Sequence, residues 1–172
     1  ICFGLLGQIG SVAENFRCLG PARYNAVAVG KIMLGYKEKV VISLEDADGK
    51  IFQLEDHYLA IFINQTQHFG KGLRCAPTAL VDDGLMDFYA IKAGSVTRGD
   101  QLAMLQQMPT GSHMKHPGIY QKQCKSCTIT LAGPGIFVVD GENVKHNGKI
   151  KMICRKNKVP VLADRGSLAL QL

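Results

Sequence analysis

Two clusters of acidic residues in this sequence could carry out chemistry. The first is DDGLMD at residues 82–87, where carboxylates flank a glycine turn. One carboxylate and nearby backbone carbonyls can hold a hard divalent cation, although a polar turn leading into a strand has the same pattern. The second is VVDGE at residues 138–142, where Asp140 and Glu142 follow an apolar strand. This pair suits a proton acceptor or a metal ligand, but Asp-Gly is also typical of a hairpin turn.

The positive charge is concentrated around the second cluster. The 172 residues carry a formal net charge of +6. Residues 115–158 hold nine Lys or Arg against Asp140 and Glu142 alone, while residues 1–114 are nearly neutral. This favours an anionic partner such as a nucleotide or a membrane surface, with a solvated sheet face as the alternative. A nucleic acid is the weakest candidate, because the basic segment offers only Tyr120 and Phe137 for base stacking.

Other common catalytic motifs are missing from the sequence. It contains no phosphate-binding loop of the G-x-x-x-x-G-K-[ST] or G-x-G-x-x-G type, no G-x-S-x-G and no H-E-x-x-H. Cys124 and Cys127 form a C-x-x-C pair, but no second closely spaced pair completes a zinc site. We therefore expect the six cysteines to be reduced thiols of an intracellular protein.

Mostly strands must position these residues. We expect helices over 11–19, 21–34 and 98–108. The first is expected from the capping-box spacing of Ser11 and Glu14, the second because Pro21 can begin a helix, and the third because residues 97–100, TRGD, can cap it. A turn at 46–49 predicts a hairpin. The expected strands are 39–44, 50–54, 57–64, 85–91, 119–131, 135–140, 149–155 and 159–162. Few helices and consecutive strands predict an α+β fold that is mostly β, an antiparallel β-sandwich in one domain.

Four sequence blocks together resemble a known family. They are ENFRCLGPARY at 14–24, FGKGLRCAPTALVDDGLMD at 69–87, PTGSHMKHP at 109–117 and VVDGE at 138–142. In this order and separation they resemble the C-terminal half of the diacylglycerol kinase and sphingosine kinase superfamily of lipid kinases. The first block is similar to the E-x-x-R-x-L-G-x-x-R-[YF] signature of eukaryotic sphingoid-base and ceramide kinases. The resemblance covers essentially the whole chain.

The resemblance implies an organisation for the protein. Residues 1–172 would form the C-terminal antiparallel β-sandwich that binds the acceptor lipid. A nucleotide domain with a G-G-D-G-T motif would precede it, and this motif is not present in the 172 residues. The chain would then be part of a longer cytoplasmic, peripherally membrane-bound enzyme and inactive alone. A homodimer is left open.

The resemblance also implies roles for particular residues. Asp83, with the backbone carbonyls of Leu80 and Leu85, would hold Mg²⁺. Glu142 or Asp140 would be the acid/base group near the γ-phosphate of ATP and the lipid hydroxyl. The loop 64–77 would pack against the cleft between this domain and the nucleotide domain, where the acceptor lipid would bind. The reaction would be phosphoryl transfer from ATP to a primary hydroxyl, which depends mainly on positioning and charge neutralisation.

The sequence departs from the family at the place where the acceptor's amine would bind. Gln8 and Gly10 stand where sphingosine kinases carry acidic residues, one of which is thought to meet the cationic amine of the sphingoid base. A neutral acceptor, ceramide or diacylglycerol, is therefore as consistent with the sequence as a sphingoid base, and Gln8 could supply hydrogen bonds to it. The alternative function is a non-catalytic lipid-binding or membrane-docking module built on the same sandwich.

Overall fold

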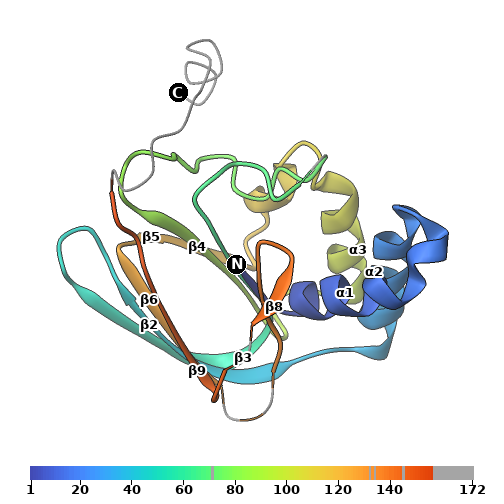
Figure 1. Cartoon of the computed structure of the whole chain (residues 1–172), viewed down its shortest axis with the longest axis horizontal. Helices are drawn as coiled ribbons and strands as arrows, with labels where there is room; N and C mark the ends of the chain where they lie inside the picture. The colour runs from blue at the N-terminus through green and yellow to red at the C-terminus, as the bar shows by residue number, and fades with distance from the viewer. Residues whose placement is uncertain (71, 132, 134, 145, 157–172) are drawn as a thin grey trace.

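The chain folds into one curled antiparallel sheet with its helices gathered beside it (Figure 1). The computed structural model describes residues 1–70, 72–131, 133, 135–144 and 146–156. Within them the helices are α1 Leu5–Ala13, α2 Ala22–Leu34 and α3 Arg98–Gln107, with 3₁₀ turns η1 Glu14–Leu19 and η2 Ser112–Lys115. The strands are β1 Cys2–Gly4, β2 Glu38–Glu45, β3 Ile51–Asn64, β4 Met86–Lys92, β5 Ile119–Cys124, β6 Ser126–Leu131, β7 Phe137–Val139, β8 Glu142–Val144 and β9 Lys149–Ile153. The predicted mostly-β antiparallel fold is confirmed.

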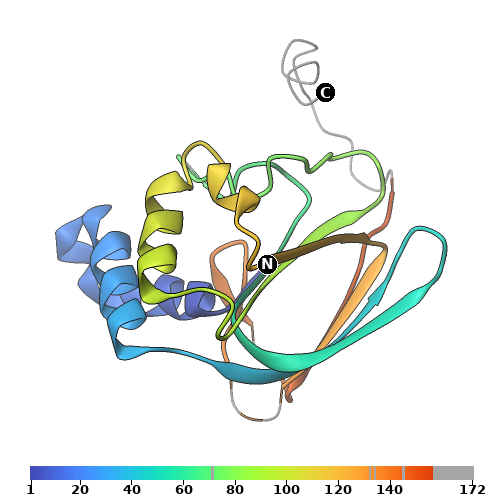
Figure 2. The same ribbon diagram turned by 180° about the vertical axis from the view of Figure 1, so that it is seen from behind.

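The inner face of the curled sheet holds the main hydrophobic core. The sheet order is β8-β7-β1-β3-β2-β6-β9, and β4 and β5 continue from β3 on another path. Val40, Ile42 and Leu44 alternate along β2 and are fully buried, as is Ile129 opposite Ile42 on β6. This period of two is what places one side chain in two inside a sheet. Figure 2 shows from behind how the strands curl around this core.

The longest strand, β3, corrects the prediction of two separate strands at 50–54 and 57–64. It runs unbroken over Ile51–Asn64. Its first half alternates between partly buried and exposed residues, whereas residues 58–64 are all buried. The change follows from what covers it, since the second half lies between β1 and β4 and is packed on both faces. The register shifts between Tyr58 and Ala60, where the strand bends from one pairing to the other.

The N-terminal helix was predicted in the wrong place. The structure has α1 over Leu5–Ala13 and a 3₁₀ turn over Glu14–Leu19, instead of a helix over 11–19. Ser11 lies inside α1 and caps nothing, so the capping-box spacing was misleading. Gly4 instead ends β1 with φ 76°, and an added Cβ there would lie 2.6 Å from the carbonyl oxygen of Leu59. A glycine therefore lets the chain turn from β1 into α1 directly against β3.

The other expected elements are close to those observed. The helix expected at 21–34 is α2, with Pro21 at its N-cap position. The α3 helix begins with the predicted cap: the Thr97 hydroxyl accepts from the Asp100 amide, and the Asp100 carboxylate accepts from the Thr97 amide. The expected strand 119–131 is two strands, β5 and β6, divided at Lys125. The strand β8 was not predicted, and the strand expected at 159–162 lies outside the described residues.

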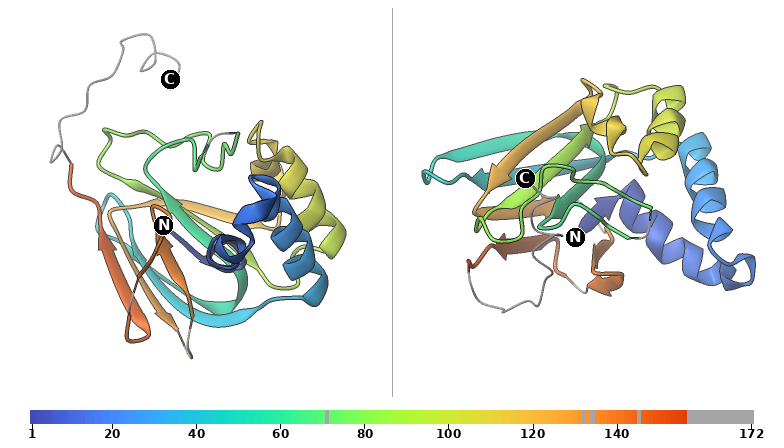
Figure 3. Two further views of the ribbon diagram at one scale, coloured as in Figure 1. Left: turned by 45° about the vertical axis from the view of Figure 1, so that its right-hand side comes forward. Right: turned by 90° about the horizontal axis from the view of Figure 1, so that it is seen from above.

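The helices form a layer beside the sheet and cover part of one face (Figure 3). Leu5 and Ile9 of α1 pack with Ala28 and Ile32 of α2, and this cluster includes Ala60 of β3. Among the described residues, no helix combines the length and apolar character needed to cross a bilayer.

Candidate functional site

One end of the sheet gathers both acidic clusters. Strand β3 ends at Asn64, which pairs with Asp87 near the start of β4. Strand β7 ends at Val139, next to Asp140, and its Val138 pairs with Cys2 at the start of β1. The order β7-β1-β3-β4 puts two strands between the clusters, which at the usual strand spacing is roughly 14 Å from β7 to β4. The two clusters therefore lie at the same end of the sheet but are not in contact with each other.

The first cluster is a hydrogen-bonded turn before β4. Asp83 is half-buried, and its Oδ1 accepts the backbone amide of Leu85 at 2.8 Å. Its Oδ2 accepts Gln123 Nε2 from β5 at 3.4 Å. Gly84 adopts φ 81°, a conformation that suits glycine. The interpretation as a polar turn is thus structurally correct, and the turn also holds the Asp83 carboxylate in place.

The turn's oxygens have the right chemistry for Mg²⁺. The expected ligands are one carboxylate, from Asp83, and the carbonyls of Leu80 and Leu85, all hard oxygen donors. In the part of the chain that the structure describes, the Leu80 carbonyl accepts no hydrogen bond, so its lone pairs are available. The same part contains no group of three or more His, Cys, Asp or Glu side chains that could hold a metal. A cation here would therefore rely on backbone oxygens and water beside Asp83.

A buried group of polar side chains lies next to this turn, and no sequence motif indicated it. Asn64, Asp87 and Tyr89 are 7%, 5% and 1% exposed. Asn64 Nδ2, Asp87 Oδ2 and Tyr89 Oη have no hydrogen-bond partner among the described residues. Burial raises the pKa of the Asp87 carboxyl and raises the pKa of Tyr89 to about 12. Unsatisfied buried polar atoms are rare in folded proteins and mark sites of water, ligand or strain.

The second cluster is a two-residue hairpin between β7 and β8. Val139 pairs with Glu142, so Asp140 and Gly141 are the turn residues. Asp140 has φ 49° and is the one non-glycine residue with positive φ in the described ranges. The predicted hairpin turn is thus present, and it places Glu142 in an exposed position at the start of β8.

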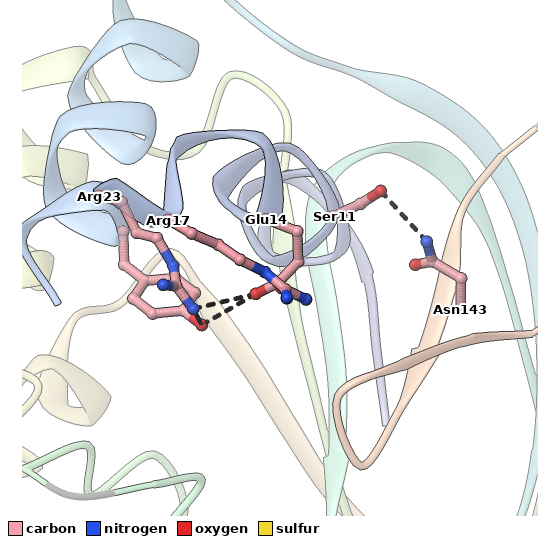
Figure 4. A network of polar contacts seen from close by, with 6 residues as sticks. Ser11, Glu14, Arg17, Arg23 and Asn143 are labelled. Atoms are coloured by element: carbon pink, nitrogen blue, oxygen red, sulfur yellow. Dashed lines mark hydrogen bonds and ion pairs between the residues drawn. The ribbon is translucent and has the colours of Figure 1, made fainter. Parts of the chain in front are cut away.

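A network of arginines lies beside this hairpin (Figure 4). Arg17 Nε donates to Glu14 Oε2 at 2.8 Å, and Arg23 Nη2 donates to Glu14 Oε1 at 3.0 Å. The Arg23 guanidinium also lies over the Tyr24 ring, 4.7 Å from its centroid. The hydrogen bond from Arg17 holds the pKa of Glu14 below its usual value. Asn143 Nδ2, next to Glu142, donates to Ser11 Oγ at 3.2 Å and so joins β8 to the end of α1.

This network was present in the sequence as the spacing E-x-x-R-x-L-G-x-x-R, but the sequence analysis gave its arginines no role. The turn of η1 and the start of α2 bring Arg17 and Arg23, six positions apart, onto the same carboxylate. The Arg17 side chain is 76% exposed, which leaves most of its donors free for a ligand. The fold therefore places two arginines near the Glu142 hairpin, whereas the sequence had indicated only the carboxylates there.

Gln8 and Gly10 lie on α1, as part of the same helical layer. The Gln8 side-chain oxygen accepts Lys31 Nζ of α2 at 2.8 Å. An added Cβ at Gly10 would meet no atom within 4 Å. The ammonium group of Lys31 thus places a positive charge directly beside Gln8.

The loop after β3 covers the outer face of the sheet. Cys75, Ala76 and Ala79 are buried against Phe62 and Tyr89, whose rings stack with centroids 4.9 Å apart. The cysteines of the C-x-x-C pair are also structural: Cys124 and Cys127 are fully buried, on β5 and β6, and burial raises the pKa of Cys124 to about 12. All six cysteines are free thiols.

Comparison with known proteins agrees with this fold. A family model described as the YegS C-terminal NAD kinase beta sandwich-like domain matches residues 1–160. A crystal structure described as a diacylglycerol kinase from Bacillus anthracis str. Sterne has 16% identity and a TM-score of 0.51, covering 92% of this chain and 50% of that chain. A second structure from the same organism has 16% identity and a TM-score of 0.54, covering 83% of this chain and 46% of that one. A comparison with curated protein sequences gave no match.

The curled antiparallel sheet and the family match define the class as an NAD kinase beta sandwich-like domain. The chain belongs to the YegS C-terminal domain family, whose model matches nearly all of it. It spans about half the length of the solved structures that it matches.

Proposed function

We propose that this chain is the acceptor-lipid half of an ATP-dependent lipid kinase, which transfers phosphate to a lipid primary hydroxyl. The observation that carries the proposal is the Arg17–Glu14–Arg23 network beside the Glu142 hairpin. Phosphoryl transfer depends on positioning and on neutralising the charge of the phosphates. Guanidinium groups match phosphate oxygens in geometry and stay charged, so Arg17 and Arg23 suit the phosphates of ATP.

The hairpin carboxylates would serve the acceptor. Glu142 is exposed at the start of β8, and the adjacent Asn143 is fixed by its bond to Ser11. A carboxylate in this place can accept the proton of a lipid hydroxyl as that oxygen attacks. Asp140, in the tight turn, is the second candidate for this role.

Mg²⁺ would be held by Asp83 with the carbonyls of Leu80 and Leu85. When bound, the cation would supply positive charge at the sheet edge that carries both acidic clusters. The residues fit such an ion because Asp83 is held by the Leu85 amide and the remaining donors are hard oxygens.

A nucleotide domain outside this chain would complete the site. In this proposal it would face the end of the sheet that carries both acidic clusters. The enzyme would work in the cytoplasm at a membrane surface, where its lipid acceptor resides.

The surroundings of Gln8 favour a neutral acceptor, ceramide or diacylglycerol. Lys31 places an ammonium group 2.8 Å from the Gln8 oxygen. A sphingoid base would bring a second ammonium to the same place, and like charges repel. We expect Lys31→Met to raise the ratio of sphingosine to ceramide phosphorylation, measured as kcat/KM for each lipid. The exposed Lys37→Met is the matched control, and an unchanged ratio in Lys31→Met would exclude Lys31 as a determinant of the acceptor.

A second function, a non-catalytic lipid-docking module, is favoured by one observation. Phe16 and Leu19, which flank Arg17 in η1, are 45% and 51% exposed, and Leu34 at the end of α2 is 82% exposed. Apolar side chains flanked by cations suit the interface of a membrane even without catalysis.

The two functions are separated by a transfer assay. The full-length protein is incubated with radiolabelled ATP and vesicles that contain sphingosine, ceramide or diacylglycerol in turn. We expect one of these lipids to become labelled, and we expect Arg17→Gln or Arg23→Gln to lower kcat/KM for ATP about a hundredfold. The exposed Arg98→Gln serves as the control. Vesicle binding without labelling of any lipid would support the docking module and exclude the kinase.

A further inference from the structure

A pocket of about 440 Å³ lies at the end of the sheet away from the helices. Four parts of the chain form it: the turn after β2, the acidic turn before β4, the junction of β5 with β6, and the end of β9. These segments are far apart in sequence and converge on the left of Figure 1, while α1, α2 and α3 lie on the right. Its volume falls in the range typical of small-ligand sites.

Three lysines line this pocket: Lys125, Lys151 and Lys156. The acidic residues in its wall, Glu45 and Asp83, already have donors of their own. Ser126 Oγ donates to Glu45 at 2.9 Å, and the Leu85 amide donates to Asp83 at 2.8 Å. In contrast, Lys151 and Lys156 have no hydrogen-bond or ion-pair partner within the described ranges. With three lysines against two carboxylates, the formal charge of the pocket lining is positive.

The cations are positioned by the backbone around them. The Lys125 amide donates to the Glu45 carbonyl at 2.7 Å, and its ammonium donates to the Ala47 carbonyl. The aliphatic stem of Lys156 lies against Gly84, where an added Cβ would be 3.0 Å from the Lys156 Cβ. A glycine suits position 84 for two reasons. It tolerates the positive φ of the turn, and its lack of a side chain leaves space for the Lys156 stem.

The pocket also gives a location to part of the basic segment 115–158. Lys122, which lies nearby on β5, is already occupied: its Nζ is 3.8 Å from the Phe52 ring centroid and 3.8 Å from the Asp46 carboxylate. Lys125, Lys151 and Lys156 are instead directed to one cavity. The charge of residues 115–158 indicated an anionic partner, and this pocket is a specific place on the protein where such a partner could bind.

We propose that this lysine pocket binds a phosphate monoester or diphosphate group. Lysine ammonium groups are compact point charges that bind phosphate oxygens from several directions. The lysines come from the β5–β6 junction, from β9 and from the segment after β9, and all three line one cavity. The lysine pocket shares Asp83 and Leu85 with the proposed Mg²⁺ site but contains none of Arg17, Arg23 and Glu142. Its binding of phosphate can be measured without kinase activity.

The test measures binding of two probes to the purified protein. Pyrophosphate is titrated by calorimetry, and vesicles of phosphatidylcholine with phosphatidic acid are tested by co-sedimentation. The pocket variant is Lys151→Gln with Lys156→Gln. The control is Lys149→Gln with Lys37→Gln, which removes the same charge from exposed positions, one of them on the same face of β9. All four side chains are exposed, so equal melting temperatures will show that the variants are folded.

We expect the pocket variant to weaken binding at least about tenfold and the control to change it less than twofold. This pattern with pyrophosphate identifies a soluble phosphate compound as the ligand. The same pattern with vesicles alone identifies a phospholipid headgroup. If neither probe binds, or if both variants lose affinity equally, the lysine pocket is not a phosphate site and its charge is a solvated surface.

Discussion

Asp83 and Asp140 each lie in a turn, and the two turns place both residues at the same end of the sheet. The sequence around each residue was consistent with either a turn or a functional site. The structure contains both turns, with the Asp83 carboxylate bonded to the Leu85 amide and Asp140 at positive φ. The two interpretations are therefore compatible. The roles of Arg17 and Arg23 could not be predicted from the pattern alone, because their meeting at Glu14 depends on the path of η1.

The Mg²⁺ proposal predicts the effect of Asp83→Asn. This change removes the charge but keeps an oxygen for the Leu85 amide, so the turn should stay folded. We expect the Mg²⁺ concentration for half-maximal activity to rise about tenfold, because Mg²⁺ relies on few carboxylates and strict geometry. Asp82→Asn, at the exposed neighbouring position, is the control. An unchanged Mg²⁺ requirement in Asp83→Asn would leave the motif as a polar turn.

Asp87 predicts a dependence of stability on pH. Burial raises its pKa in the folded protein, so the folded state holds this proton to a higher pH than the unfolded state. Stability from this group is present at low pH and is lost as pH rises through the folded pKa. We expect Asp87→Asn, in metal-free buffer, to melt at a higher temperature than the wild type at pH 7, with the difference shrinking as the pH falls toward 3.9.

The control for this measurement is Asp48→Asn in the exposed β2–β3 turn. It should leave the melting temperature nearly unchanged across the same pH range. A lower melting temperature for Asp87→Asn at pH 7 would contradict this prediction, because it would mean that the ionised Asp87 carboxylate stabilises the fold.

At the scale of elements, α3 and α2 were predictable and α1 was not. Thr97 and Asp100 form the capping box that their spacing indicated. The LLGQIGSVA sequence of α1 contains two glycines, which disfavour a helix in isolation. Contacts made only in the fold override this preference, since α1 packs with α2 on β3. β8 was likewise missed because its three residues are exposed and have no hydrophobic pattern.

Two glycine variants test how α1 is placed. Gly4 has φ 76°, and a Cβ there would lie 2.6 Å from the Leu59 carbonyl oxygen, so Gly4→Ala should cost roughly 2–3 kcal/mol. Gly10 lies within α1 in open space, so Gly10→Ala should stabilise by roughly 0.5–1 kcal/mol. Urea unfolding followed by circular dichroism measures both. Similar effects of the two changes would contradict the observed junction of β1 with α1.

At the scale of the whole molecule, the alternation of strands predicted the fold class, and the resemblance predicted the family. Neither predicted that the sheet is a single curled one in which β3 serves two pairings. That arrangement depends on which faces are covered, as the full burial of residues 58–64 illustrates. The arginine network lies on η1 and α2, whereas the lysine pocket lies at the end of the sheet away from the helices, so the molecule has two separate groups of cationic side chains.

The most direct test of the proposed lipid kinase is lipid phosphorylation by the full-length protein carrying Glu142→Gln or Asp140→Asn. We expect the wild type to label a lipid hydroxyl from ATP. We expect at least one of these variants to lower kcat by ~10²–10⁴-fold while remaining folded. Glu55→Gln, an exposed carboxylate on β3 paired with Lys39, should keep wild-type turnover. Near-wild-type turnover in both hairpin variants would contradict the catalytic role of the hairpin carboxylates, and no lipid phosphorylation by the wild type would contradict the proposed kinase.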